Sequence, residues 1–442
     1  MRKSMVVGLA AAALAWPQLA AADRSMEELW QGLDNVNNRL EKLEKQGPAE
    51  GGAKKGDDLT FRVFYKDGLK FETLNEQFQF QIGGRTYVDF AFYQTDQDVK
   101  RLAGGPNEDG AEFRAARLFV SGRLYKHVVF KAEYDFAGGD ADFKDVYIGL
   151  DDIPFLGEIK VGHFKEPFGL EELTSSRFVT FMERASISEF VPGRNTGVAF
   201  QNAVLDKRAT YAFGVFREAD DFGTSEMPTS WNLTGRVTAA PYRSGSNVIH
   251  LGVAYSHKFV RSNGADIRLR QRPESHLARR FVDTGTFEAE NIDLLGAEAA
   301  VVFGPFSAQG EFLQAWINTG GGLQNIDGFR GGYALVSYFI TGESRAYKDK
   351  SGAFDRVKPK KNFYATDSEE IGCGAWELAG RFSHLRLNDR DAPILGGEMN
   401  DFTVGVNWYL NPNVRVMANW INSYVAGAGT SQVYQMRFQV DF

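Results

Sequence analysis

The sequence has a single cysteine, Cys373, only six histidines, and no long apolar run after its N-terminal segment. One cysteine excludes an intramolecular disulfide framework and a cysteine-rich zinc site. A membrane helix needs ~20 consecutive apolar residues, so a helical membrane protein is excluded. The histidines form no zinc-protease pattern, and there is no nucleophile elbow or phosphate-binding loop. We therefore expect no metal, no cofactor and no enzymatic activity.

Basic residues are also fewer than acidic ones, with 50 Lys and Arg against 57 Asp and Glu and a net charge of −7. An acidic chain is a poor general ligand for nucleic acids, so we expect no nucleic-acid partner. The same balance argues at first against a protein that handles anions. Aromatic residues are abundant, with 36 Phe, 16 Tyr and 7 Trp beside 47 Gly. Many aromatics without apolar runs are typical of a transmembrane β-barrel, because each strand is half polar.

The N-terminal region reads as a targeting segment followed by a short helix. Arg2 and Lys3 precede an apolar stretch and small residues, which predicts a signal peptide over 1–22 and therefore export. Export together with the barrel-like composition indicates a Gram-negative outer membrane. Over 23–46, heptad-spaced apolar residues predict a short periplasmic coiled-coil helix, with an amphipathic helix lying on its own domain as the alternative. Residues 47–74 are predicted to be a linker and leading segment. The apolar residues with heptad spacing are Met26, Leu29, Leu33, Val36, Leu40 and Leu43.

From residue 75 to 442 the sequence alternates between apolar and polar residues, as in Tyr434 to the final aromatic Phe442. A soluble β-sandwich would alternate too, but many of these strands are longer than a sandwich needs. Turns such as Gly304-Pro305 are short, whereas 258–290 and 342–371 are long and are predicted to be outer loops. We predict an all-β fold, a sixteen-stranded transmembrane antiparallel β-barrel. The predicted strands lie near 75–94, 112–125, 127–137, 143–151, 157–163, 196–204, 208–217, 231–239, 246–258, 291–303, 306–318, 329–341, 372–384, 400–411, 413–425 and 431–442.

The loop 258–290 is unusually rich in arginine. Arg268, Arg270 and Arg272 alternate with other residues and are followed by Arg279 and Arg280. In an extended segment, residues two apart share a face and lie roughly 7 Å from one another. Guanidinium groups are always charged and match phosphate or carboxylate oxygens in pairs. This row predicts a pore-lining ladder for anions. The alternative is a solvated loop, or one whose arginines contact lipopolysaccharide phosphates.

A second group of candidate residues lies between two predicted strands, in 165–195. It contains Lys165 and Arg184 with the hydroxyls of Ser175 and Ser176. A segment of this length with no strand pattern can fold into the lumen and narrow it, and otherwise it is a long exterior loop. The phenylalanines that could pack it against the wall are Phe168, Phe178, Phe181 and Phe190.

Several segments of the chain, taken in order, form a pattern together with the heptad N-terminus. They are Glu112–Leu118, Gly162–Gly169, Thr174–Phe178, Glu183–Arg184, Tyr338–Glu343, Gly374–Leu378 and Asn407–Pro412. In these segments the chain resembles the phosphate-selective porin O and P family of Gram-negative bacteria, over essentially the whole mature length. The resemblance implies a homotrimer of sixteen-stranded barrels, an inward constriction loop, and an arginine ladder leading to a central anion site.

Carried over by position, Ser175, Ser176 and Arg184 resemble the ligands of the central site, and Arg114 resembles the first of an adjacent arginine pair. Two residues depart from the pattern: Ala115 replaces the second arginine, and Glu172 stands where a lysine is expected. A carboxylate there would repel phosphate and pair with arginine. The predicted pore residues are Arg268, Arg270, Arg272, Arg279, Arg280, Arg114, Arg117, Ser175, Ser176, Arg184 and Lys165.

The resemblance implies a passive anion-selective channel for phosphate or related small oxyanions. The alternative, which the two departures keep open, is a general or carboxylate-preferring porin without phosphate selectivity. The expected partners are small anions, outer-membrane lipid and lipopolysaccharide, and further copies of the same chain.

Overall fold

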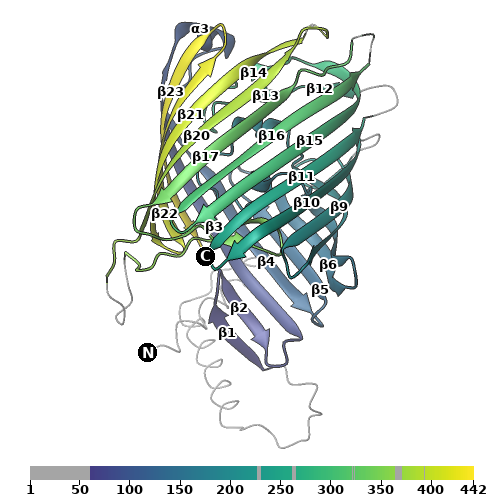
Figure 1. Cartoon of the computed structure of the whole chain (residues 1–442), viewed down its shortest axis with the longest axis vertical. Coiled ribbons are helices and arrows are strands. Elements are labelled where there is room, and N and C mark those ends of the chain that lie inside the picture. The colour runs from purple at the N-terminus through teal and green to yellow at the C-terminus, as the bar shows by residue number, and fades with distance from the viewer. Residues whose placement is uncertain are drawn as a thin grey trace, which may run out of the picture. The chain divides into compact units, whose positions relative to one another are not determined.

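A computed structural model of the chain describes residues 60–225, 230–260, 265–320, 322, 324–363, 371–392 and 394–442 (Figure 1). The predicted signal peptide, the predicted coiled-coil helix and the predicted linker as far as residue 59 lie outside these residues. In the ranges that the structure describes, no helix is long and apolar enough to cross a membrane.

Within the described residues, sixteen antiparallel strands form a closed barrel, and each overlaps one predicted strand, which confirms the predicted fold (Figure 1). The first eight are β3 (Phe78–Thr95), β4 (Gly110–Leu124), β5 (Val128–Asp135), β6 (Asp142–Ile153), β7 (Gly157–Lys165), β8 (Arg194–Val204), β9 (Ala209–Arg217) and β10 (Trp231–Ser244). The others are β11 (Asn247–Phe259), β15 (Phe287–Phe303), β16 (Phe306–Thr319), β17 (Arg330–Phe339), β20 (Ala375–Asp389), β21 (Ile394–Asn411), β22 (Val414–Val425) and β23 (Gly429–Asp441).

The barrel closes where its last strand pairs with its first. β23 runs antiparallel to β3 from the pair Ser431 and Thr95 to the pair Asp441 and Arg85. The backbone of Gly84 and Phe442 continues this pairing with hydrogen bonds of 2.7 and 3.0 Å. Closure leaves no unpaired strand edge, which is the condition for a sheet to lie in lipid.

Apolar side chains of the strands face outward and polar ones face the lumen. In β23, Tyr434 and Phe438 are 42% and 48% exposed, whereas Arg437 and Gln439 are 2% and 4% exposed. A soluble sandwich would bury the apolar face instead. The orientation therefore confirms the predicted arrangement of lipid outside and polar groups inside.

A short hairpin precedes the barrel and was missed by the strand prediction. β1 (Phe61–Tyr65) pairs with β2 (Leu69–Thr73), and β2 pairs with β3. Asp67 and Gly68 lie between the two strands with φ values of 56° and 130°, conformations that Asp-Gly turns favour. The other short elements are α3 (Gln97–Leu102), α4 (Leu170–Leu173), η2 (Ser186–Glu189), β12 (Ala265–Ile267), β13 (Arg270–Gln271), β14 (Val282–Asp283), β18 (Tyr347–Lys348) and β19 (Ala353–Phe354).

The connection from β17 to β20 lies at the other end of the barrel from the one predicted. Consecutive connections of an antiparallel barrel alternate between its ends, so this segment shares an end with the short turn at Gly304-Pro305. The amide of Phe339 donates to the carbonyl of Pro305 at 3.0 Å, which confirms the proximity. The prediction of 342–371 as an outer loop was wrong, because it rested on the length of the segment. It ignored the number of preceding strands, which decides at which end of the barrel a connection lies. Part of the segment is buried, as at Phe354 and Val357.

We predict that Gly83→Ala weakens barrel closure. A Cβ at Gly83 would lie 2.4 Å from the carbonyl oxygen of Phe442 and 2.6 Å from the ring of Phe119. We expect a loss of about 1–3 kcal/mol in the free energy of unfolding, measured by urea titration in detergent. The matched control is Gly380→Ala in β20, where a Cβ meets nothing within 4 Å. Equal midpoints for both variants would contradict the prediction.

Candidate functional site

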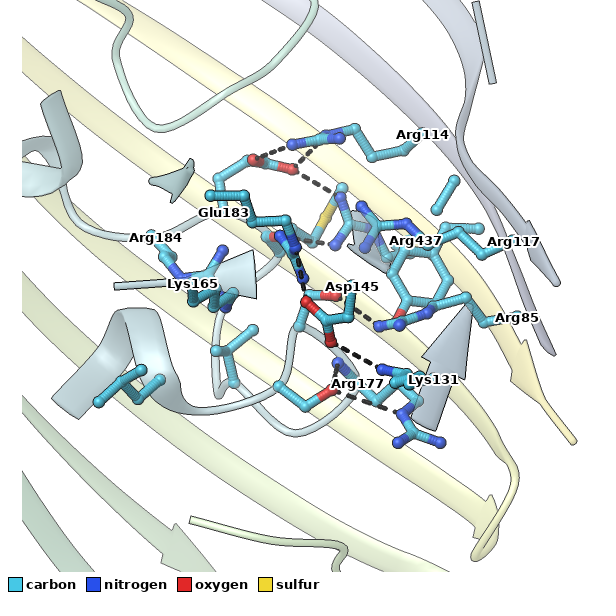
Figure 2. A pocket seen from close by; sticks show the side chains of 18 residues that line it. Arg85, Arg114, Arg117, Lys131, Asp145, Lys165, Arg177, Glu183, Arg184 and Arg437 are labelled. Atoms are coloured by element: carbon cyan, nitrogen blue, oxygen red, sulfur yellow. Dashed lines mark hydrogen bonds and ion pairs between the residues drawn. The ribbon is translucent and has the colours of Figure 1, made fainter. Parts of the chain in front are cut away.

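A series of cavities runs along the inside of the barrel. The outer cavity, of about 920 Å³, shares Arg272 and Arg280 with a second one of about 270 Å³. The second shares Arg114, Glu183 and Arg184 with a central cavity of about 200 Å³ (Figure 2). Each boundary between these cavities therefore carries two arginines.

The central cavity also opens toward the short-turn end. It shares Lys131 and Lys165 with an inner cavity of about 300 Å³, whose lining includes Lys348 from the β17–β20 connection. The central cavity is the smallest of these four, so it marks the constriction.

Nine basic side chains and two acidic ones line the central cavity (Figure 2). The acidic residues are Asp145 and Glu183. An anion in this cavity would meet an excess of positive charge on most sides. The basic residues are Arg85, Arg114, Arg117, Lys131, Lys165, Arg177, Arg184, Arg194 and Arg437.

Buried carboxylates behind the lining hold these cations in place. Arg85 on β3 and Arg117 on β4 are cross-strand neighbours, a position in which like charges repel. Glu133 on β5, with 0% side-chain exposure, forms an ion pair with Arg85 and lies 3.5 Å from Nη1 of Arg117. Nε of Arg117 also donates to Asp135 at 2.7 Å. The carboxylates thus allow two adjacent guanidinium groups to face the same lumen.

Glu183 joins two further arginines of the lining. Its carboxylate accepts two hydrogen bonds from Arg114, at 2.9 and 3.0 Å, and one from Arg437 at 2.7 Å, as Figure 2 shows. Arg437 also donates twice to Asp89, its cross-strand partner, at 2.7 Å each. Such paired, charge-assisted hydrogen bonds fix the planes of both guanidinium groups.

The segment 166–193, between β7 and β8, lies inside the barrel, and we call it the constriction segment. Phe168, Phe181 and Phe190 are 5% exposed or less, which confirms that they pack against the wall. The carbonyls of Val179 and Thr180 accept hydrogen bonds of 2.8 Å from wall side chains of β22 and β21. The alternative prediction of an exterior loop is wrong.

Six of the predicted pore residues meet at the central cavity: Arg114, Arg117, Lys165, Ser175, Ser176 and Arg184. Oγ of Ser176 accepts a hydrogen bond of 2.9 Å from Arg85. Arg184 donates to the carbonyls of Glu171 and Thr174 at 3.0 and 3.1 Å, so it shapes the constriction segment as well as lining the cavity. Their role in binding an anion stays a prediction.

Glu172, one of the two departures from the family pattern, makes the pairing that the sequence predicted. Its carboxylate lies 2.9 Å from Nζ of Lys165 and 3.0 Å from Nε of Arg184. Ala115, the other departure, lines the central cavity and brings no charge to it.

Sequence reasoning missed several basic residues of the central cavity that stand on barrel strands. Arg85, Lys131 and Arg437 come from β3, β5 and β23. The alternation along each strand could have identified them, because the polar residues of an alternating strand face the lumen. Tyr87 also lines the cavity, with its side chain almost fully buried.

The five predicted arginines of the loop 258–290 line the outer cavity together. Arg268 forms an ion pair with Asp283, and Arg279 donates to the carbonyl of Pro106 at 2.9 Å. Within the described residues, the guanidinium groups of Arg270, Arg272 and Arg280 form no hydrogen bond or ion pair. These three retain donors for a passing anion.

Glu274 holds this arginine-rich loop against the wall. Its carboxylate, with 0% side-chain exposure, accepts hydrogen bonds from Arg381, Ser383 and Thr403, the last at 2.7 Å. The loop also contacts the constriction segment, since the amide of Arg270 donates to Glu189 at 2.8 Å. The outer arginines and the constriction are therefore parts of one connected structure. No cluster suited to hold a metal ion is found in the ranges that the structure describes.

Comparison with known proteins relates the chain to porins. Residues 80–442 match the model of the family described as phosphate-selective porin O and P. Porin O of Pseudomonas aeruginosa is 28% identical over 406 residues, which cover 83% of this chain and 87% of that protein.

Solved porin structures share the fold. The high-pH structure of OprB from Pseudomonas putida has a TM-score of 0.52 at 10% identity, covering 84% of this chain and 95% of that one. OmpT of Vibrio cholerae in its trimer form has a TM-score of 0.50 at 9% identity, covering 83% and 99%. At such low identity these similarities support the architecture alone.

We predict that the charge selectivity of this lumen depends on pH through Glu189. Burial raises the pKa of Glu189 to about 7, so the carboxyl is neutral below that pH and negative above it. A negative Glu189 beside Arg270 and Arg280 weakens the positive potential of the outer cavity. We expect the anion-over-cation permeability ratio to fall about twofold as the pH rises from about 5.5 to about 8.5.

Reversal potentials in a potassium chloride gradient measure this ratio. Glu189→Gln removes the titrating group and should flatten the pH dependence near 7. An unchanged pH profile in Glu189→Gln would show that another group titrates.

Proposed function

The chain belongs to the phosphate-selective porin O and P family, and we propose that small anions cross it through the four connected cavities, guided by their arginines and lysines. It is an anion porin of the Gram-negative outer membrane, a channel and not an enzyme. What we propose is the route, the residues along it and the class of anion.

The observation that carries the proposal is the continuity of basic residues along the route. Every boundary between cavities has two or more of them, and the smallest of the four cavities has nine. An anion can pass from one guanidinium to the next without losing all of its partners. Because no boundary is lined by apolar residues alone, the anion stays solvated by fixed donors throughout.

The central cavity supports a site for oxyanions such as phosphate. Several guanidinium groups and the hydroxyls of Ser175 and Ser176 line a space of about 200 Å³. Oxyanions accept paired hydrogen bonds from arginine, and neutral hydroxyls add donors without adding charge. Arg114, Arg117, Lys165 and Arg184 complete the proposed ligand set.

A second candidate is a general or carboxylate-preferring porin. The observation that favours it is the carboxylate of Glu172, which already occupies Lys165 and Arg184 at 2.9 and 3.0 Å. A phosphate dianion would be repelled there more strongly than a monovalent anion.

Assembly and membrane contacts extend the proposal. We propose a homotrimer, as in the trimer form of the similar OmpT structure. The outward apolar residues would contact lipid, as exposed Phe402 and Phe438 can. Lipopolysaccharide phosphates would be partners for exposed outer-loop cations such as Arg101.

Single-channel recording of the purified protein in planar bilayers tests the function. We expect a reversal potential that favours chloride over potassium, and chloride current that falls when phosphate is added. Preference for potassium would contradict the anion route, whereas current unaffected by phosphate would favour the second candidate.

We predict that replacing Arg268, Arg270 and Arg272 together by Ala lowers chloride conductance about threefold, because the outer cavity loses three charges that concentrate anions. Conductance in dilute potassium chloride measures the effect. The control is Arg101→Ala in α3, whose side chain is 79% exposed and pairs with Asp98 outside these cavities. Equal conductance in the triple variant and the control would place the arginine row outside the route.

We also predict that the detergent-purified protein is a trimer. Native mass spectrometry should give the mass of three chains, and heating in detergent should give the mass of one. A monomer under conditions that preserve the barrel would contradict the proposed assembly.

A further inference from the structure

Glu172 occupies an unusual place in the lumen because it bridges two cations that face different cavities. Lys165 lines the central and inner cavities, whereas Arg184 lines the central cavity and the second one. The carboxylate of Glu172 contacts both, at 2.9 and 3.0 Å, and itself lines the second cavity. Its side chain is 14% exposed, as is that of Lys165. The three residues therefore span the constriction from one side to the other.

The bridge differs from the buried carboxylates that stand behind the lining of the central cavity. Glu133 and Asp89, which hold Arg85 and Arg437, are on barrel strands and are fully or nearly fully buried. They stand behind the cations, in the wall. Glu183 also faces the lumen from the constriction segment, but its two arginines do not line the inner cavity. Glu172 is on the constriction segment and reaches its cations from the direction by which an anion would arrive from the second cavity. A resident carboxylate thus takes up donors that a permeating anion needs.

We propose that Glu172 is a tethered counter-ion, which competes with the permeating anion for Lys165 and Arg184 and so sets the valence preference of the channel. This inference rests on the proposed anion conduction. While the carboxylate stays in place, an arriving anion meets one negative charge in addition to the two positive ones. The Coulomb energy scales with the product of the charges, so a dianion is penalised twice as much as a monoanion. Glu172 therefore weakens the binding of dianions and keeps small monovalent anions moving.

The test compares a dianion with a monoanion in Glu172→Gln, which removes the charge and keeps the shape. The dianion is sulfate, measured by the concentration that halves the chloride current. The monoanion is nitrate, measured by its permeability relative to chloride. We expect the half-inhibitory sulfate concentration to fall about tenfold. The nitrate ratio should change less than about twofold.

Two matched controls separate competition from other effects. Glu112→Gln removes a carboxylate near the outer end of β4, where it pairs with His276 and lines none of the four cavities. Glu172→Asp keeps the charge and shortens the side chain. We expect sulfate inhibition in both controls to stay close to that of the wild type. Sulfate inhibition that is tenfold stronger in Glu112→Gln would show a general effect of the field. Stronger sulfate inhibition in Glu172→Asp would show a change of loop shape. Either result overturns the proposal.

A chemical version of the test uses one folded protein throughout. Cys373 is the only cysteine, so Glu172→Cys in a Cys373→Ser background gives a single labelling site. A sulfonatoethyl thiosulfonate restores the negative charge, and a trimethylammonium reagent reverses it. Sulfate should inhibit strongly after the positive label and weakly after the negative one, and equal inhibition would overturn the proposal. If the wild-type channel prefers potassium over chloride, that result overturns the proposed function itself, whatever the variants show.

Discussion

The pairing of lumen arginines with buried carboxylates is the interaction on which this structure depends. Unpaired guanidinium groups crowded inside a barrel repel one another and resist leaving water. Glu133 behind Arg85 and Asp89 behind Arg437 remove that obstacle, because both carboxylates lie in the wall with almost no exposure. Each arginine has five donors, so a carboxylate behind it leaves donors for the lumen. The barrel can therefore present many cations without losing stability.

The same interaction fixes the two segments that narrow the lumen. Arg381 on β20 joins Glu171 of the constriction segment to Glu274 of the arginine-rich loop. Glu311 on β16 accepts the amide hydrogens of Leu170 and Glu171 at 2.8 and 2.7 Å. Aromatic side chains such as Phe181 seal these contacts from water, which strengthens each hydrogen bond. The position of the outer arginines and the width of the constriction are thus set together.

The barrel could be predicted from the sequence because the alternation of apolar and polar residues is visible within each single strand. The alternation over β23 predicts which residues face lipid, and the structure agrees residue by residue. The candidate site was predictable in part, since Ser175, Ser176 and Arg184 lie in one segment with a family pattern. The pairs Arg85 with Glu133 and Arg381 with Glu274 could not be predicted, because their partners are 48 and 107 residues apart. The β17–β20 connection was misplaced for a related reason, since its end of the barrel follows only from counting every strand before it.

The acidic composition, which at first argued against an anion channel, follows from this way of building one. Many of the lumen cations pair with a carboxylate, so the number of acidic residues rises with the number of basic ones. What decides the field in the pore is which partner faces the lumen. Around the central cavity nine cations line the space while Glu133, Asp135 and Asp89 stand behind them. Glu172, like Asp145 and Glu183, faces the lumen, and a carboxylate so placed acts on the anion directly. Net charge is therefore uninformative about selectivity, whereas the depth of each carboxylate in the wall is decisive.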